Sequence, residues 1–459
     1  MTFSSILFCF IFLPMSIVLY YLIPKKYRNI YLLIISLIFY SVSGIKNLLI
    51  LLFVIIYNYY AALKLDSLKD KKRKYKLIEI IIINVFLLLY FKYYFSFLNV
   101  ILPNNKFKTF MFPLGLSFYI FTLLSYIIDI YKKNIHAEKN IHAEKNFINF
   151  SLYIAFFPKL VMGPIMRYKD FRKQLPRTGF NGSLFNNGFK RFTIGLGMKV
   201  ILADTISKII SSYEVSSMIG MIVIMVLTSL LIYYDFAGYT NMAIGIANVF
   251  GFNLPENFNY PYMSQNVSEF WRRWHITLGN WFKDYIYIPL GGSKKGRKIL
   301  ARNIMVVWLL TGIWHGSSFN FILWGLYFGI LILIDKFVFS KIKMPKPLGI
   351  ILTFILVSFG WVIFFNNDLS IMFKNISYLF NFKKFIDPNI INLLRNNFIY
   401  IIMGLLLSTP IMKKIGDKIK EKNLLIYNLG WNFMVVIILL LSTSFLVNNS
   451  YQPFLYFKF

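Results

Sequence analysis

Apolar stretches about as long as a lipid bilayer is thick recur along the whole chain, for example at residues 6–22, 218–234, 348–365 and 424–441. A transmembrane helix needs about 20 mostly apolar residues, and somewhat shorter runs also suffice. Only 15% of the 459 residues are charged, whereas soluble proteins carry roughly a quarter. The sequence therefore predicts an all-α, polytopic membrane protein in which residues 1–459 form a single integral membrane domain.

The net charge of +32 comes largely from short basic blocks between the apolar runs, such as residues 25–28 and 70–76. Basic loops of this kind mark the cytoplasmic side of a membrane and attract anionic lipid headgroups. The charge therefore does not point to nucleic acid. Alternation of basic and uncharged loops predicts about twelve spans with both chain ends outside. We expect a multi-pass protein of the cytoplasmic (inner) membrane of the cell.

Two regions do not fit a pattern of simple spans. Residues 147–166 lie between two basic loops on the same side, and residues 236–300 are rich in glycine, proline and polar side chains. Irregular backbone at membrane depth survives only where protein buries it or where it lines a wet cavity. We therefore expect both regions to form re-entrant or interfacial helices around a central polar funnel.

Ionisable residues within membrane-embedded sequence are costly, so each of them is a candidate for function. They are Asp129, Asp235, Glu269, Arg272, Arg273, His275, Asp284 and His315. His315 is the most isolated, because residues 306–313 before it are almost wholly apolar. A histidine can take up a proton near neutral pH, so His315 is a candidate general base for a hydroxyl substrate. A packing histidine bonded to a neighbouring helix is an equally good interpretation.

The segment SEFWRRWHITLGNWFKDYIYIPLGG, residues 268–292, mixes charged and aromatic side chains. If it is one helix, one face of it carries Trp271, Trp274, His275 and Leu278, and the two arginines lie mostly off that face. Tryptophans suit the membrane interface, so an anchoring helix is the simpler interpretation. In the alternative, the segment lines a cytoplasmic mouth that binds an anionic donor. The donor-binding residues would then be Arg272, Arg273, Trp274 and Lys283.

A tandem hexapeptide, IHAEKNIHAEKN, occupies residues 135–146. Its two histidines, His136 and His142, are too few to define a metal site. We interpret the segment as a short duplication in a solvated loop and expect no metal.

The chain ends in NNSYQPFLYFKF, where Tyr456 lies among phenylalanines. The simpler interpretation is an aromatic anchor at the membrane interface. In the alternative, the tyrosine hydroxyl lies close to the outer mouth of the cavity.

Several long motifs resemble the membrane-bound O-acyltransferase (MBOAT) family, and within it the branch of alginate and peptidoglycan O-acetyltransferases. They are PLGLSFYIFTLLSYIIDIY (113–131), FFPKLVMGPIMRYKDF (156–171), YDFAGYTNMAIG (234–245), residues 255–292, and GIWHG with WG (312–325). The resemblance covers residues 1–340, with 341–459 as C-terminal helices that end in the aromatic motif. Two positions depart from it: Asn241, where relatives usually have an acid, and Phe328, where many have histidine.

The resemblance implies a ring of helices around a funnel that crosses the membrane. It implies that His315 is the catalytic histidine, that His275 is the second family histidine, and that Tyr456 receives the acyl group. The resemblance further implies that an activated donor, for which we expect acetyl-CoA, approaches from the cytoplasm, with no cofactor bound permanently. It implies as well that an extracytoplasmic SGNH-type hydrolase-like protein completes O-acetylation of a cell-surface polysaccharide, such as an exopolysaccharide of the cell envelope. Alternatives are D-alanyl transfer to teichoic acid and, from a different class, a transporter or channel.

Overall fold

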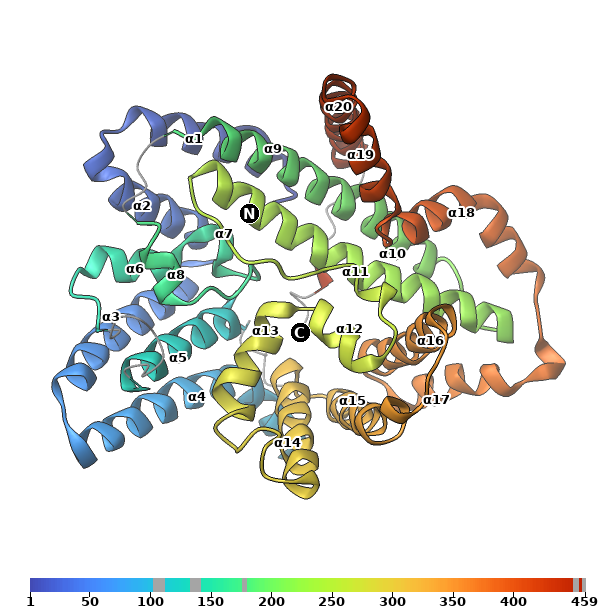
Figure 1. Cartoon of the computed structure of the whole chain (residues 1–459), viewed down its shortest axis with the longest axis horizontal. Coiled ribbons are helices and arrows are strands. Elements are labelled where there is room, and N and C mark those ends of the chain that lie inside the picture. Colours follow the sequence, from blue (N-terminus) through green and yellow to red (C-terminus); the bar gives the residue numbers. More distant parts are fainter. Residues whose placement is uncertain (102–111, 133–141, 176–179, 449–453, 456–459) are drawn as a thin grey trace. The chain divides into compact units, whose positions relative to one another are not determined.

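The computed structural model describes residues 1–101, 112–132, 142–175, 180–448 and 454–455. These residues form helices and no β-strand; the one isolated bridge among them joins Phe258 and Trp274 (Figure 1). The all-α prediction is therefore confirmed.

The α-helices are α1 (Leu13–Leu22), α2 (Arg28–Ser41), α3 (Ile45–Ser67), α4 (Asp70–Ile101), α5 (Leu116–Lys132), α6 (Phe147–Ala155), α7 (Phe157–Leu160), α8 (Tyr168–Arg172), α9 (Gly182–Gly197), α10 (Asp204–Ser211), α11 (Met218–Val249), α12 (Val267–Arg273), α13 (Ile276–Phe282), α14 (Arg297–His315), α15 (Phe319–Phe337), α16 (Lys346–Phe365), α17 (Leu369–Ser377), α18 (Pro388–Leu407), α19 (Ile411–Lys422) and α20 (Leu424–Asn448). Wide π-helical turns form η1 (Phe8–Phe12), η3 (Met198–Ala203) and η5 (Lys283–Tyr287). Short 3-10 turns form η2 (Lys25–Tyr27), η4 (Pro261–Met263), η6 (Phe339–Lys341), η7 (Tyr378–Phe380) and η8 (Phe382–Lys384).

Among the described residues, seven helices are long and apolar enough to cross a membrane. They are Ile45–Ser67, Asp70–Tyr94, Met218–Val249, Phe319–Lys341, Lys346–Phe365, Pro388–Leu407 and Leu424–Asn448. The polytopic character is confirmed, and the count of about twelve is not. One predicted span, the apolar run at residues 6–22, is not among the seven, because its helix covers only Phe8–Leu22 and is shorter than the 18 residues required of a candidate span.

The chain divides into two compact units. Unit 1 comprises Met1–Phe192 and Thr240–Pro255, and unit 2 comprises Thr193–Tyr239 and Glu256–Phe459. The two boundaries on the N-terminal side of residue 255 fall within helices, α9 and α11.

The two regions predicted to be irregular differ in outcome. Residues 147–166 do break into the short helices α6 and α7. For residues 236–249 the prediction is wrong, because α11 continues unbroken to Val249. The glycines in this part of α11 are not breaks but close packing points: a Cβ on Gly238 would lie 2.9 Å from the carbonyl oxygen of Gly195. Short, interrupted helices begin only after α11, with α12 and α13.

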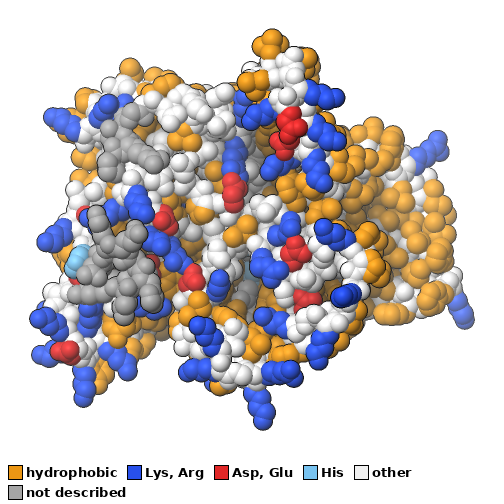
Figure 2. Space-filling model, in the orientation of Figure 1, with side chains coloured by type: hydrophobic (Ala, Val, Ile, Leu, Met, Phe, Trp, Pro, Cys, Tyr) orange, Lys and Arg blue, Asp and Glu red, His pale blue; other side chains and the backbone are white. Residues whose placement is uncertain are grey.

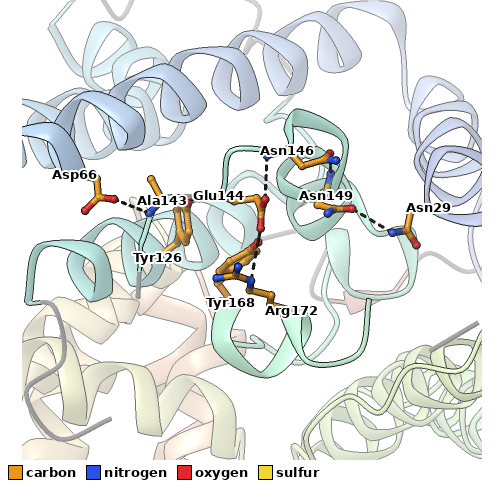
Figure 3. A network of polar contacts seen from close by, with 9 residues as sticks. All are labelled: Asn29, Asp66, Tyr126, Ala143, Glu144, Asn146, Asn149, Tyr168 and Arg172. Atoms are coloured by element: carbon orange, nitrogen blue, oxygen red, sulfur yellow. Dashed lines mark hydrogen bonds and ion pairs between the residues drawn. The ribbon is translucent and has the colours of Figure 1, made fainter. Parts of the chain in front are cut away.

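In unit 1 the second copy of the tandem hexapeptide takes part in a polar network (Figure 3). The backbone N–H of Ala143 donates to Asp66 at 3.1 Å, and that of Glu144 donates to the Tyr126 hydroxyl at 2.8 Å. The Glu144 carboxylate accepts from the Tyr168 hydroxyl and from the Asn146 N–H. His142 lies 3.1 Å from Asp66, and His136 lies outside the described residues. This copy therefore joins the end of α3, the middle of α5 and the start of α8.

Helices α14 and α15 of unit 2 pack closely because glycines face the neighbouring backbone. A Cβ on Gly312 would lie 2.4 Å from the carbonyl oxygen of Phe321, and one on Gly325 would lie 2.5 Å from that of Trp308. Larger residues would therefore force the two helices apart. These two helices carry the histidine and the tryptophan that matter most for the site below.

We expect Gly325→Leu to destabilise the protein by about 3 kcal/mol, because overpacking at a backbone contact forces the helices to shift. Gly430→Leu on α20 is the matched control, since no atom lies within 4 Å of a Cβ at that position. Thermal unfolding in detergent measures both. Equal melting temperatures for the two variants would contradict the close packing of α14 and α15.

Candidate active site

Unit 2 contains a cavity of about 510 Å³. Six helices contribute to its wall, for example through Ile232 of α11, Trp271 of α12, Leu278 of α13, Trp308 of α14, Trp324 of α15 and Trp361 of α16. Both candidate histidines, His275 and His315, line it. The structure therefore brings together two residues that lie 40 positions apart in the sequence.

His315 is the last residue of α14 and is 6% exposed. Aromatic rings surround its imidazole, with centroid distances of 4.6 Å to Trp314 and 5.0 Å to both Trp324 and Phe364. The rings of Trp324 and Phe364 present edges almost perpendicular to the imidazole, at 84° and 87°. This box fixes the plane of the ring while leaving it on the cavity wall, as a positioned proton acceptor requires.

His275 forms the junction between α12 and α13. Its backbone is left-handed, with φ 44° and ψ 52°, a conformation that non-glycine residues seldom adopt. The break ends α12 at Arg273, so the segment is not the single helix on which the predicted common face depended. Trp271, Trp274, His275 and Leu278 nevertheless all line the cavity.

Asn257 determines which ring nitrogen of His275 carries hydrogen. Its Oδ1 accepts from the Thr277 backbone N–H at 3.2 Å and from the Thr277 hydroxyl at 2.8 Å. A backbone N–H can only donate, so this atom of Asn257 is the amide oxygen. His275 Nδ1 lies 3.2 Å from the same oxygen and must therefore donate to it. The other nitrogen, Nε2, is then the basic one.

Burial also keeps His275 uncharged. The residue is 3% exposed and lies outside the candidate spans, and burial lowers the pKa of its imidazole to about 3. A group whose pKa is this low is neutral throughout the physiological range. His275 is therefore a neutral, oriented wall residue in the folded protein.

Three of the residues that line the cavity are exposed cations. They are Arg272, Lys283 and Lys336. On the face drawn in Figure 2, lysine and arginine side chains gather over α12 to α14, whereas α17 and α18 show mainly hydrophobic ones. The cavity thus joins a positively charged rim to a buried aromatic interior.

Arg273 does not appear among the described residues that line the cavity. Its guanidinium forms an ion pair with Glu269 at 2.7 Å and donates to the carbonyl oxygen of Asn259 at 3.3 Å. Trp274, in contrast, lies on the wall and stacks on Phe270 at 5.5 Å. Of the four predicted donor-binding residues, three therefore reach the cavity.

Several residues of this site escaped the sequence interpretation, among them Lys336, Asn257 and Phe364. Lys336 lies near the end of α15, where a lysine in the last turn looks like an ordinary helix-ending cation. Asn257 lies in a loop before α12, and its only signal was its place within the long motif at 255–292. Tyr456 lies outside the described residues, so its prediction stays a prediction.

The family model described as MBOAT, membrane-bound O-acyltransferase family, matches residues 35–409. The chain is 36% identical over 398 residues to the "Probable alginate O-acetylase AlgI" of Pseudomonas aeruginosa, covering 83% of this chain and 75% of that protein. It is 32% identical to the "Peptidoglycan O-acetyltransferase" of Helicobacter pylori, covering 81% and 78%. The "Teichoic acid D-alanyltransferase" of Bacillus subtilis is 31% identical, but over only 46% of this chain and 60% of its own length.

The family model spans most of the chain and includes both candidate histidines, and the two long matches extend over four fifths of the chain. The chain therefore belongs to the membrane-bound O-acyltransferase family and is a multi-pass membrane enzyme of that family.

Proposed function

We propose that this enzyme takes an acetyl group from cytoplasmic acetyl-CoA and passes it through the inner membrane for O-acetylation of a cell-surface polysaccharide. Two long relatives carry names that specify O-acetylation, of alginate and of peptidoglycan. A separate extracytoplasmic protein of the SGNH type would complete the transfer. Coenzyme A is too strongly charged to cross a bilayer, whereas an acetyl ester is neutral.

The observation that carries the proposal is the composition of the cavity. His315 lies in an aromatic box and lines the same cavity as three exposed cations. A thioester donor has an anionic, phosphate-bearing end and a reactive end that is apolar. The cations suit the first end, and the buried interior suits the second.

The reaction would proceed as a simple acyl transfer. The acceptor hydroxyl oxygen attacks the thioester carbonyl, and His315 takes the hydroxyl proton. A C–O bond forms, the C–S bond breaks, and the proton passes to the departing thiolate of coenzyme A. In this scheme Tyr456 is the first acceptor, and the resulting acetyl-tyrosine then delivers the acetyl group to the extracytoplasmic partner.

Arg272→Gln should raise the KM for the donor about tenfold, a loss of about 1.4 kcal/mol of binding free energy. The kcat should change much less, because the phosphates lie away from the reacting carbonyl. Arg273→Gln is the matched comparison, since the Arg273 guanidinium pairs with Glu269 instead of lining the cavity. We expect its KM to stay within about twofold of the wild type. If Arg273→Gln gives the larger increase, the assignment of the rim is wrong.

D-alanyl transfer to teichoic acid is the alternative enzyme function, because a named D-alanyltransferase is also a relative. The decisive experiment expresses the full chain in its host, releases esters from the isolated envelope polymers with mild alkali, and identifies them by mass spectrometry. The same measurement is made on a strain from which the gene is deleted. Loss of acetate in the deletion strain supports the proposal, and loss of D-alanine instead overturns it. Loss of solute flux without any change in esters would instead favour a transporter.

A further inference from the structure

A buried ion cluster lies in unit 2, outside the described wall of the cavity. Lys199 Nζ lies 2.7 Å from Asp204 Oδ1 and 2.8 Å from Asp235 Oδ1. The side chains of Lys199 and Asp235 are each 2% exposed. Burying a charge costs free energy unless the charge is paired and hydrogen-bonded. A cluster buried this deeply is therefore expected either to serve a function or to bind a further partner that offsets the cost.

The wide π turn η3 makes this cluster possible. In a regular α-helix, side chains five residues apart point about 140° away from each other. Here the Asp204 N–H bonds to the Lys199 carbonyl, which closes a turn of five residues and brings both side chains to one side. Such π turns occur frequently at functional sites.

The cluster binds the protein's own C-terminal segment. The backbone N–H of Leu455 donates to Asp235 Oδ2 at 2.9 Å. The ring of Phe454 lies 4.6 Å from Lys199 Nζ and meets Tyr239 edge to face at 5.1 Å, and it is completely buried. A charge-assisted hydrogen bond and a cation–π contact therefore hold two consecutive residues.

The same face of α11 leads from this segment to the cavity. Four of its residues follow the spacing i, i+3, i+4, i+7, which places them on one stripe of a helix: Ile232, Asp235, Phe236 and Tyr239. Ile232 lines the cavity, and Phe236 contacts the His275 imidazole at 4.8 Å. Asp235 and Tyr239 hold Leu455 and Phe454. The tail site thus begins one helical turn from the cavity wall.

We propose that Asp235 and Lys199, the latter held in place by Asp204, form a binding site for the segment Phe454–Leu455. Asp235 and Lys199 thereby act as positioning residues for Tyr456, which follows directly in the sequence. The second half of this inference rests on the proposed function, in which Tyr456 accepts the acyl group. The first half stands on the contacts alone.

The binding site is tested by thiol labelling in the full chain. Cys9 is the only cysteine, so Cys9→Ser with Leu455→Cys places a single thiol in the segment and keeps the backbone N–H that bonds Asp235. Residue 455 is half-buried, so a maleimide reacts with this thiol faster when the segment opens. Asp235→Asn and Phe454→Ala should each accelerate labelling about tenfold, since each removes one of the holding contacts.

Ser229→Ala is the matched control. Ser229 is also buried on α11, but its hydroxyl bonds Ser358 at 2.8 Å, away from the tail. Its labelling rate should equal that of the parent. Phe454→Ala changes only the tail, so it keeps the test valid if Asp235→Asn fails to fold. Unchanged rates in every folded variant would overturn the inference.

The positioning role has a separate readout. We expect Asp235→Asn to lower the kcat of acyl transfer about tenfold and to leave the KM for the donor within about twofold, because in the proposed function the donor's phosphates bind at the exposed cations of the cavity and not at Asp235. Mass spectrometry of Tyr456 distinguishes the two halves. Faster labelling without any acyl group on wild-type Tyr456 supports the binding site and overturns the positioning role. An acylated Tyr456 with unchanged labelling overturns the binding site and leaves the proposed function intact.

Discussion

His315→Ala is expected to lower acyl transfer by at least about 10²-fold, and up to about 10⁴-fold, the range that a general base contributes. The rings packed around the His315 imidazole are those of Trp314, Trp324 and Phe364, and none of these three side chains can serve as a general base in its place. Transfer is measured with radiolabelled acetyl-CoA in proteoliposomes. Full activity in the variant would remove His315 from the mechanism.

His142→Ala provides the matched control for that experiment. This histidine is exposed in unit 1, 3.1 Å from Asp66, and it has no place in the proposed chemistry. Its activity should equal that of the wild type. Melting temperatures of both variants separate a chemical defect from unfolding, since His315 is buried and His142 is not.

Tyr456→Phe should abolish the relay, with a loss of about 10³-fold in acetylation of the polymer, because the substitution removes the nucleophilic oxygen and nothing else. Membrane insertion and stability should be unaffected. Peptide mass spectrometry of the wild type should find the acetyl ester on Tyr456. Tyr451→Phe, in the same tail, should leave acetylation unchanged; a similar loss in both variants would point to a general effect on the tail.

The sequence was most informative where a single physical constraint dominates. Apolar runs predict membrane helices directly, and seven such helices are present in the described residues. The expensive residues His275 and His315 were recognised as candidates because they interrupt apolar or aromatic sequence, and the structure places both on one cavity. The motif resemblance added the role of each residue, which composition could not supply.

The sequence was less informative where tertiary packing overrides local signals. The glycines after Asp235 look like breaks, yet Gly238 and Gly245 remain inside α11 because neighbouring backbone packs against them. Conversely, the residues next to His275 in the sequence do not predict its left-handed backbone. Its imidazole instead bonds the side-chain oxygen of Asn257, which lies in a separate loop. Lys336 joins the cavity through the packing of α15, which no spacing along the chain reveals.

The left-handed backbone at His275 also determines which substitutions this position can accept without loss of the fold. Asparagine and aspartate tolerate that conformation better than other side chains with a Cβ. Their codons each differ from those of histidine by one nucleotide. A single transversion can therefore remove the imidazole from the cavity wall while preserving the backbone turn that separates α12 from α13.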